Sequence, residues 1–141
     1  MIKNTRILAL LLTFLTTTSV FPQTYSFENS KVPDNWKIDK GAINATGDKY
    51  KAGKQSLQIK WEQGAVLTLT TPNGLSEACK SRNGGISTWI YNESPTEEPM
   101  IFFFKDSKGK EVCQLPFLLN FKGWRCIWAK FQNDMNMSAK S

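Results

Sequence analysis

The amino-acid sequence predicts an all-β fold, a β-sandwich of the jelly-roll type. The first observation is that apolar residues in its regular segments recur at every second position, as they do in strands with one buried face. The second is that these segments are short and are separated by turn-forming residues. The third is that a high aromatic content, with five Trp and nine Phe, occurs without any amphipathic helical period.

The first half of the domain contains two alternating segments. Residues 55–61 place Leu, Ile and Trp on one face, and residues 65–71 repeat the alternation after a turn at Gln63-Gly64. We therefore expect a β-hairpin over residues 55–71. The segment 75–84 is polar and irregular, and it predicts at most one helical turn.

The second half predicts two strand pairs. Residues 85–91 alternate and are expected to pair with the strand over residues 124–131. Residues 100–105 contain five consecutive apolar residues before Lys105, which predicts a strand that is buried on both faces or central in a sheet. A turn at residues 106–110 connects this run to a return strand at residues 111–119, whose proline requires a sheet edge or a bulge.

The N-terminus has the order of parts found in secretory signal peptides. Lys3 and Arg6 precede an apolar run at residues 7–15 that is too short to span a bilayer. We predict a signal peptide over residues 1–23, export to the periplasm or the medium, and one domain over residues 24–141. The alternative is that the run is the first strand or helix of the domain.

The chain is mildly basic, and its charge suits some partners better than others. The formal net charge is +6, and it falls to +4 when Lys3 and Arg6 leave with the signal peptide. A positive surface would attract an acidic polysaccharide, or it could serve only solubility. The basic residues are scattered rather than clustered, and the chain is expected to be exported, so we exclude nucleic acid as a partner.

The cysteines do not form a metal-binding pattern. Cys79, Cys113 and Cys126 are odd in number and lack the Cys-X-X-Cys spacing, and the chain has no His. A zinc site is therefore not expected. Cys113 and Cys126 lie on neighbouring predicted strands, and they form either a disulfide or a pair of small buried residues.

Catalytic chemistry is poorly supported. Without His, every Ser-His-Asp, Cys-His and His-metal scheme is excluded. The remaining acids, such as Glu93 with Glu97 or Glu98, lie in polar loops, where they are ordinary surface carboxylates. We predict no catalytic residue in this chain.

Aromatic and basic side chains are better candidates for a binding site. Flat rings stack on sugar faces, and Arg pairs with sulfate or carboxylate groups. The five tryptophans cannot all be buried if the strands alternate, although core packing is the ordinary role of an aromatic ring in a sandwich. The predicted carbohydrate contacts are Trp89, Tyr91, Trp124 and Arg125.

Five segments together resemble the N-terminal domain of chondroitin sulfate ABC lyases. They are Tyr-Ser-Phe-Glu-Asn at 25–29, Val-Pro-Asp-Asn-Trp at 32–36, the Gly-X-Gln-Ser-Leu strand within 50–57, Gly-Ile-Ser-Thr-Trp-Ile-Tyr-Asn-Glu at 85–93, and Leu-Asn-Phe-Lys-Gly-Trp-Arg at 119–125. The resemblance covers nearly all of the predicted domain, and the combination is far more specific than any one segment.

The resemblance implies a parent that is a large exported bacterial polysaccharide lyase, cleaving chondroitin and dermatan sulfate by β-elimination. Such lyases open with a jelly-roll domain similar to carbohydrate-binding modules, and a helical toroid that follows carries the catalytic residues. This sequence stops before that toroid and before the last strand of the first domain. We therefore expect a fragment with no membrane span that is not a lyase by itself.

Two roles remain open on this resemblance. The domain either helps to hold a glycosaminoglycan for a downstream lyase catalytic domain, or it packs on that toroid as a purely structural domain. An exposed apolar patch on one sheet face would favour the structural role.

The resemblance also implies one structural cation. Related jelly-roll modules bind it with oxygen ligands from the first strand and from the loop before the Gly-X-Gln-Ser strand, and hard oxygen ligands suit calcium or sodium. The alternative is that the acid and amide in this set only hydrogen-bond the loop. The matching positions are Ser26, Glu28, Ala52 and Gln55.

Overall fold

The structure is a computed structural model that describes residues 25, 27–70, 72 and 74–137. The predicted signal peptide therefore lies outside the described residues. In this described part, no helix has the length and apolar character needed to cross a membrane.

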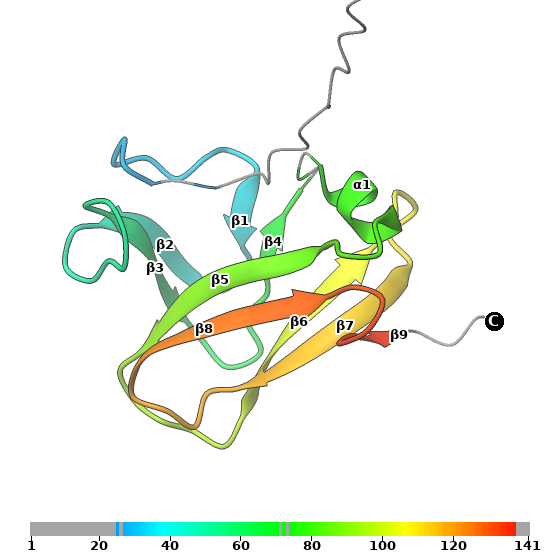
Figure 1. Cartoon of the computed structure of the whole chain (residues 1–141). Helices are drawn as coiled ribbons and strands as arrows, with labels where there is room; N and C mark the ends of the chain where they lie inside the picture. Colours follow the sequence, from blue (N-terminus) through cyan, green and yellow to red (C-terminus); the bar gives the residue numbers. More distant parts are fainter. Residues whose placement is uncertain (1–24, 26, 71, 73, 138–141) are drawn as a thin grey trace, which may run out of the picture.

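Short antiparallel strands make up most of the described chain, which confirms the predicted all-β class. A single helix of six residues interrupts them (Figure 1). In chain order the elements are β1 (Trp36–Ile38), β2 (Gly41–Thr46), β3 (Ser56–Trp61), β4 (Leu67–Leu69), α1 (Leu75–Lys80), β5 (Gly85–Asn92), β6 (Pro99–Lys105), β7 (Glu111–Leu118), β8 (Gly123–Lys130) and β9 (Asn136–Met137).

Both strand pairs predicted in the second half are confirmed. β5 pairs with β8 along its whole length, from Gly85 opposite Lys130 to Asn92 opposite Gly123. β6 and β7 form the expected hairpin, and the Asp106 carboxylate closes its turn by accepting hydrogen bonds from two backbone N–H groups. Pro116 lies in β7 outside the two residues that pair with β9. This position suits proline, which has no backbone N–H to donate to a neighbouring strand.

The predicted hairpin over residues 55–71 is wrong in its pairing. The turn exists, because the Ala65 N–H donates to the Glu62 carbonyl at 3.0 Å. However, β3 pairs with β2, and β4 pairs with β1. Alternation identifies a strand but does not choose its partner. β1 has only three residues, and β2 has only one large apolar residue, so neither strand could be recognised from the sequence.

Two strand pairs stack with their apolar faces together, as expected of a sandwich. Ile86 of β5 and Ala129 of β8 share one cluster with Cys113, Leu115 and Phe104 of the β6–β7 hairpin. Helix α1 covers one end of this cluster (Figure 1). Because the strands form four hydrogen-bonded groups rather than two continuous sheets, the jelly-roll winding stays a prediction.

Two predictions about burial are wrong. Residues 100–105 are not buried on both faces, since Ile101 and Phe103 point away from the core and are exposed. Cys126 is exposed as well, whereas Cys113 is buried, and both are free thiols. The physical reason is the same in both cases: the described residues cover only the inner face of each sheet.

Candidate functional site

Four aromatic side chains lie on the outer face of the β5–β8 pair. In the antiparallel register, Tyr91 is opposite Trp124, Trp89 is opposite Cys126, and Trp128 is opposite Ser87. Residues opposite each other share a face, and so do residues two positions apart along a strand. We call the surface formed by Trp89, Tyr91, Trp124 and Trp128 the aromatic face.

The four rings differ in how they are presented to solvent. Trp89 is 48% exposed and Trp128 is 66% exposed. Tyr91 and Trp124 are half-buried and support each other edge to face, with ring centroids 5.3 Å apart. From Trp124 to the end of β8 the face extends over six residue steps, or roughly 20 Å. The broad rings of Trp89 and Trp128 are therefore exposed to a flat ligand, and the packed pair of Tyr91 and Trp124 lies on the same face.

Lysines lie over three of these rings. The Nζ atom of Lys51 is 4.4 Å from the Trp89 ring centroid, that of Lys49 is 5.3 Å from Tyr91, and that of Lys130 is 5.4 Å from Trp128. Such contacts are favourable because the ring face carries negative charge. In the described part of the chain, these three ammonium groups form no ion pair with a carboxylate. The three ammonium groups therefore bring positive charge to the aromatic face.

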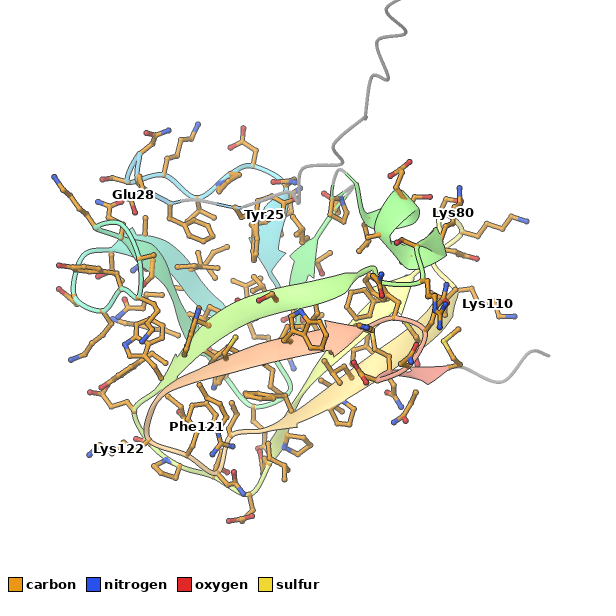
Figure 2. The ribbon with its side chains drawn as sticks, viewed as in Figure 1. Tyr25, Glu28, Lys80, Lys110, Phe121 and Lys122 are labelled. Atoms are coloured by element: carbon orange, nitrogen blue, oxygen red, sulfur yellow. The ribbon has the colours of Figure 1, made fainter. Side chains whose placement is uncertain are left out.

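The loop between β2 and β3 brings two of these lysines to the face. Its far side is held by Glu28, whose carboxylate accepts hydrogen bonds from the Lys54 N–H at 2.9 Å and the Gln55 N–H at 3.1 Å (Figure 2). Gln55 in turn accepts a hydrogen bond from the Ser30 N–H at 3.0 Å. The loop is thus fixed on the sandwich by polar contacts.

The same residues bear on the predicted cation. Ser26 lies outside the described residues, and Ala52 is exposed in the loop. The side-chain oxygens of Glu28 and Gln55 are directed at backbone N–H groups, which is the geometry of the loop-anchoring alternative. In the part of the chain that the structure describes, there is no cluster of three or more acidic or cysteine ligands. A bound calcium or sodium ion stays a prediction.

The structure brings together three of the four residues predicted to contact carbohydrate. Trp89, Tyr91 and Trp124 share the aromatic face, whereas Arg125 alternates to the other side of β8. There its guanidinium lies 4.4 Å from the Phe121 ring centroid. Sequence reasoning missed four residues of the site. They are Trp128 and Lys130, which the alternation along β8 could have revealed, and the loop residues Lys49 and Lys51, which no periodicity reveals.

A second exposed surface lies on the outer side of the β6–β7 hairpin. Its members are uncharged, and the register places Ile101 opposite Pro116 and Leu118 opposite Pro99. Phe103 on the same face is 49% exposed. We call Ile101, Phe103, Pro116 and Leu118 the apolar face. Contiguous exposed apolar residues of this kind mark interaction surfaces in many proteins.

A known family matches most of the chain. The family described as "Lyase, N terminal" matches residues 22–141. The chain belongs to this family. It is the N-terminal domain of the chondroitin sulfate ABC lyases, as the five sequence segments predicted.

Curated relatives of this lyase N-terminal domain are much longer proteins. The chain is 33% identical over 118 residues to the chondroitin sulfate ABC exolyase of Bacteroides thetaiotaomicron, with 79% of the chain and 11% of the relative covered. It is 29% identical over 122 residues to the chondroitin sulfate ABC endolyase of Proteus vulgaris, with 79% of the chain and 12% of the relative covered. It is 30% identical over 123 residues to the chondroitin sulfate ABC exolyase of the same organism, with 84% of the chain and 12% of the relative covered. The chain thus spans about a tenth of the length of these relatives.

Proposed function

We propose that this chain is a non-catalytic glycosaminoglycan-binding domain of an exported chondroitin and dermatan sulfate lyase. It would hold the polymer for a catalytic domain that resembles those of the relatives. The observation that carries the proposal is the aromatic face, where exposed Trp89 and Trp128 lie beside lysines that form no ion pair with a carboxylate among the described residues. The family membership supplies the substrate class, since the relatives are named for chondroitin sulfate.

The chemistry of the face matches that of the polymer. A glycosaminoglycan alternates apolar sugar faces with sulfate and carboxylate groups. Tryptophan rings offer flat apolar surface to the sugar faces. Lys49, Lys51 and Lys130 offer ammonium groups to the anions, and attraction over the whole face assists encounter.

A titration of the chain with chondroitin sulfate oligosaccharides tests the proposal. We expect binding that quenches or shifts tryptophan fluorescence and that weakens strongly as salt rises. Raising the salt from 0.01 M to 1 M shortens the Debye length from about 30 Å to about 3 Å, which screens the lysine contacts. Trp89→Ala should weaken binding about tenfold, the loss typical of a central aromatic contact.

Trp61→Ala is the matched control for this experiment. Trp61 has nearly the same exposure as Trp89, 50% against 48%, but it lies at the end of β3. Its replacement should leave the affinity unchanged. The proposal fails if the chain shows no salt-sensitive binding, or if the Trp61 and Trp89 variants lose affinity equally.

A second candidate function is a structural one, and the apolar face favours it. The continuous apolar run at residues 100–104 is typical of a strand covered on both sides, yet the described residues cover β6 on one side only. A neighbouring lyase domain would supply the missing cover. The Bacteroides thetaiotaomicron exolyase without its own first domain is the probe: it should capture the chain but not the Phe103→Ser variant. Equal capture of both variants would exclude a role for this face.

A further inference from the structure

The lysines of the β2–β3 loop occupy the ring faces that a sugar would use. Lys51 is the nearest, with its Nζ atom 4.4 Å from the Trp89 ring centroid, and Lys49 covers Tyr91 at 5.3 Å. Neither residue belongs to the β5–β8 pair. A ligand that stacks on the face of Trp89 that Lys51 covers must therefore displace the Lys51 ammonium first.

The loop itself is anchored, so this cover is built into the fold. On one side the Glu28 carboxylate holds the N–H groups of Lys54 and Gln55. The Ser56 hydroxyl donates a hydrogen bond to the Lys49 carbonyl, which fixes the start of the loop. Since the backbone is held at both ends, a displaced lysine side chain stays beside the ring rather than leaving with the loop.

Displacement has opposite consequences for two classes of glycan. A neutral sugar removes the ammonium from the ring and gives it no new partner, so the cation–π contact is lost. A glycosaminoglycan removes the same ammonium but offers it a sulfate or carboxylate oxygen, forming a charge-assisted hydrogen bond. The covering lysine therefore penalises the first class and favours the second.

We propose that Lys51, assisted by Lys49, makes the aromatic face selective for anionic over neutral glycans. This inference rests on the proposed function, because it assumes that the aromatic face is the glycan site. It adds a specificity-determining residue that acts both by blocking a ring and by binding an anion. Lys130 over Trp128 belongs to β8 rather than to the loop, and its Nζ atom also donates to Asn83 Oδ1 at 3.4 Å.

The test compares two ligands across wild type and two Lys51 variants. The affinities of a chondroitin sulfate hexasaccharide and of a neutral chitohexaose are measured by calorimetry for wild type, Lys51→Ala and Lys51→Arg. Lys51→Ala should weaken chondroitin sulfate binding and tighten chitohexaose binding, each by about two- to fivefold, the factor that one exposed cation–π contact represents. Lys51→Arg keeps a cation over the ring and should behave as wild type.

Lys80→Ala is the control, since it removes one positive charge from α1, outside the loop and the β5–β8 pair. It should leave the ratio of the two affinities unchanged. Parallel weakening of both ligands by Lys51→Ala, or no change in either, overturns the inference. If wild type binds chondroitin sulfate and Trp89→Ala weakens this binding as predicted, the proposed function survives that result. No binding of either ligand by wild type overturns the proposed function together with this inference.

Discussion

At the scale of single residues, Asn92 has a structural role that its position at the end of β5 does not reveal. Its Nδ2 group donates to the carbonyls of Leu119 at 2.7 Å and Phe121 at 2.9 Å. Both acceptors belong to buried residues of the segment that leads into β8. The Asn92 side chain thus links the end of β5 to the segment where the Asn-Phe-Lys-Gly-Trp-Arg motif begins.

We therefore expect Asn92→Ala to lower the free energy of unfolding by about 1–3 kcal/mol, because the carbonyls of Leu119 and Phe121 each lose one donor, although that of Leu119 keeps the hydrogen bond from the Thr96 N–H. Urea unfolding followed by tryptophan fluorescence measures this change. Asn44→Ala serves as the control, since Asn44 forms an exposed side-chain contact with Gln58. Its loss should change the free energy by less than about 0.5 kcal/mol. Equal effects would contradict the role given to Asn92.

The three thiols should differ in reactivity. Burial raises the pKa of the Cys79 thiol, and burial followed by neighbouring Cys79 and Glu111 raises that of Cys113. A raised pKa lowers the thiolate fraction at any given pH, and the thiolate is the reactive form. Cys126 is exposed on the outer side of β8.

At pH 8 we expect iodoacetamide to modify one thiol rapidly in the folded chain and all three in denaturant. Peptide mass mapping should place the fast modification at Cys126, and Cys126→Ser should remove it. As the pH rises further, the raised pKa values of Cys79 and Cys113 should keep their modification slow. Two rapidly modified thiols in the folded state would show that the α1 end of the core opens readily.

At the scale of elements, the β2–β3 loop depends on one close approach. Gly53 has φ of +70°, and a Cβ atom there would lie 2.2 Å from Glu28 Oε1. Gly109 in the β6–β7 turn has a similar φ of +79° but open space around it. Both glycines have a left-handed backbone, but only Gly53 has a close neighbour. Comparing them therefore separates the cost of the backbone conformation from the cost of a steric clash.

Gly109→Ala should destabilise the fold by about 1 kcal/mol through the left-handed backbone alone. Gly53→Ala should destabilise the fold by at least about 1 kcal/mol more than Gly109→Ala, because it also forces Glu28 away from the loop N–H groups. Urea unfolding gives both values, and the Gly53 variant should also lose chondroitin sulfate affinity as Lys51 shifts. Equal destabilisation would mean that Glu28 does not hold the loop.

The same geometry leads to an expectation about metal. Glu28 and Gln55 accept hydrogen bonds from backbone N–H groups, and these contacts favour the loop-anchoring alternative over the predicted cation site. We expect excess EDTA to leave the melting temperature unchanged. A fall that calcium reverses would support the cation site predicted from the family resemblance instead, and Glu28→Gln should then remove the response to calcium.

Sequence periodicity predicted the elements that carry enough apolar residues and missed those that do not. The β5–β8 pair was foreseen because β5 alternates over eight residues and the strand ends at clear turn signals. The β2 strand, Gly-Ala-Ile-Asn-Ala-Thr, contains one large apolar residue, so its pairing with β3 could not be recognised. For the site, three rings were foreseen from strand alternation. Lys49 and Lys51 were not, because tertiary anchoring of a loop alone brings them to the rings.

At the scale of the whole molecule, the two exposed faces point in opposite directions. Ile86 and Ala129 on the inner side of β5–β8 pack against Phe104 and Leu115 on the inner side of β6–β7. The aromatic face and the apolar face are therefore the two outer surfaces of one sandwich, and stacked sheets are about 10 Å apart. A polymer can occupy one face while a neighbouring domain covers the other.

This arrangement predicts that the two faces act independently. Substitutions separated by more than about 7–10 Å without shared partners have nearly additive effects. Phe103→Ser should thus reduce binding of an apolar dye yet leave chondroitin sulfate affinity within about twofold of wild type. Trp89→Ala should do the reverse, and the double variant should show the sum of both effects. If Phe103→Ser instead weakens glycan binding as much as Trp89→Ala, the faces are coupled through the core, and the glycan and docking roles cannot be assigned to separate surfaces.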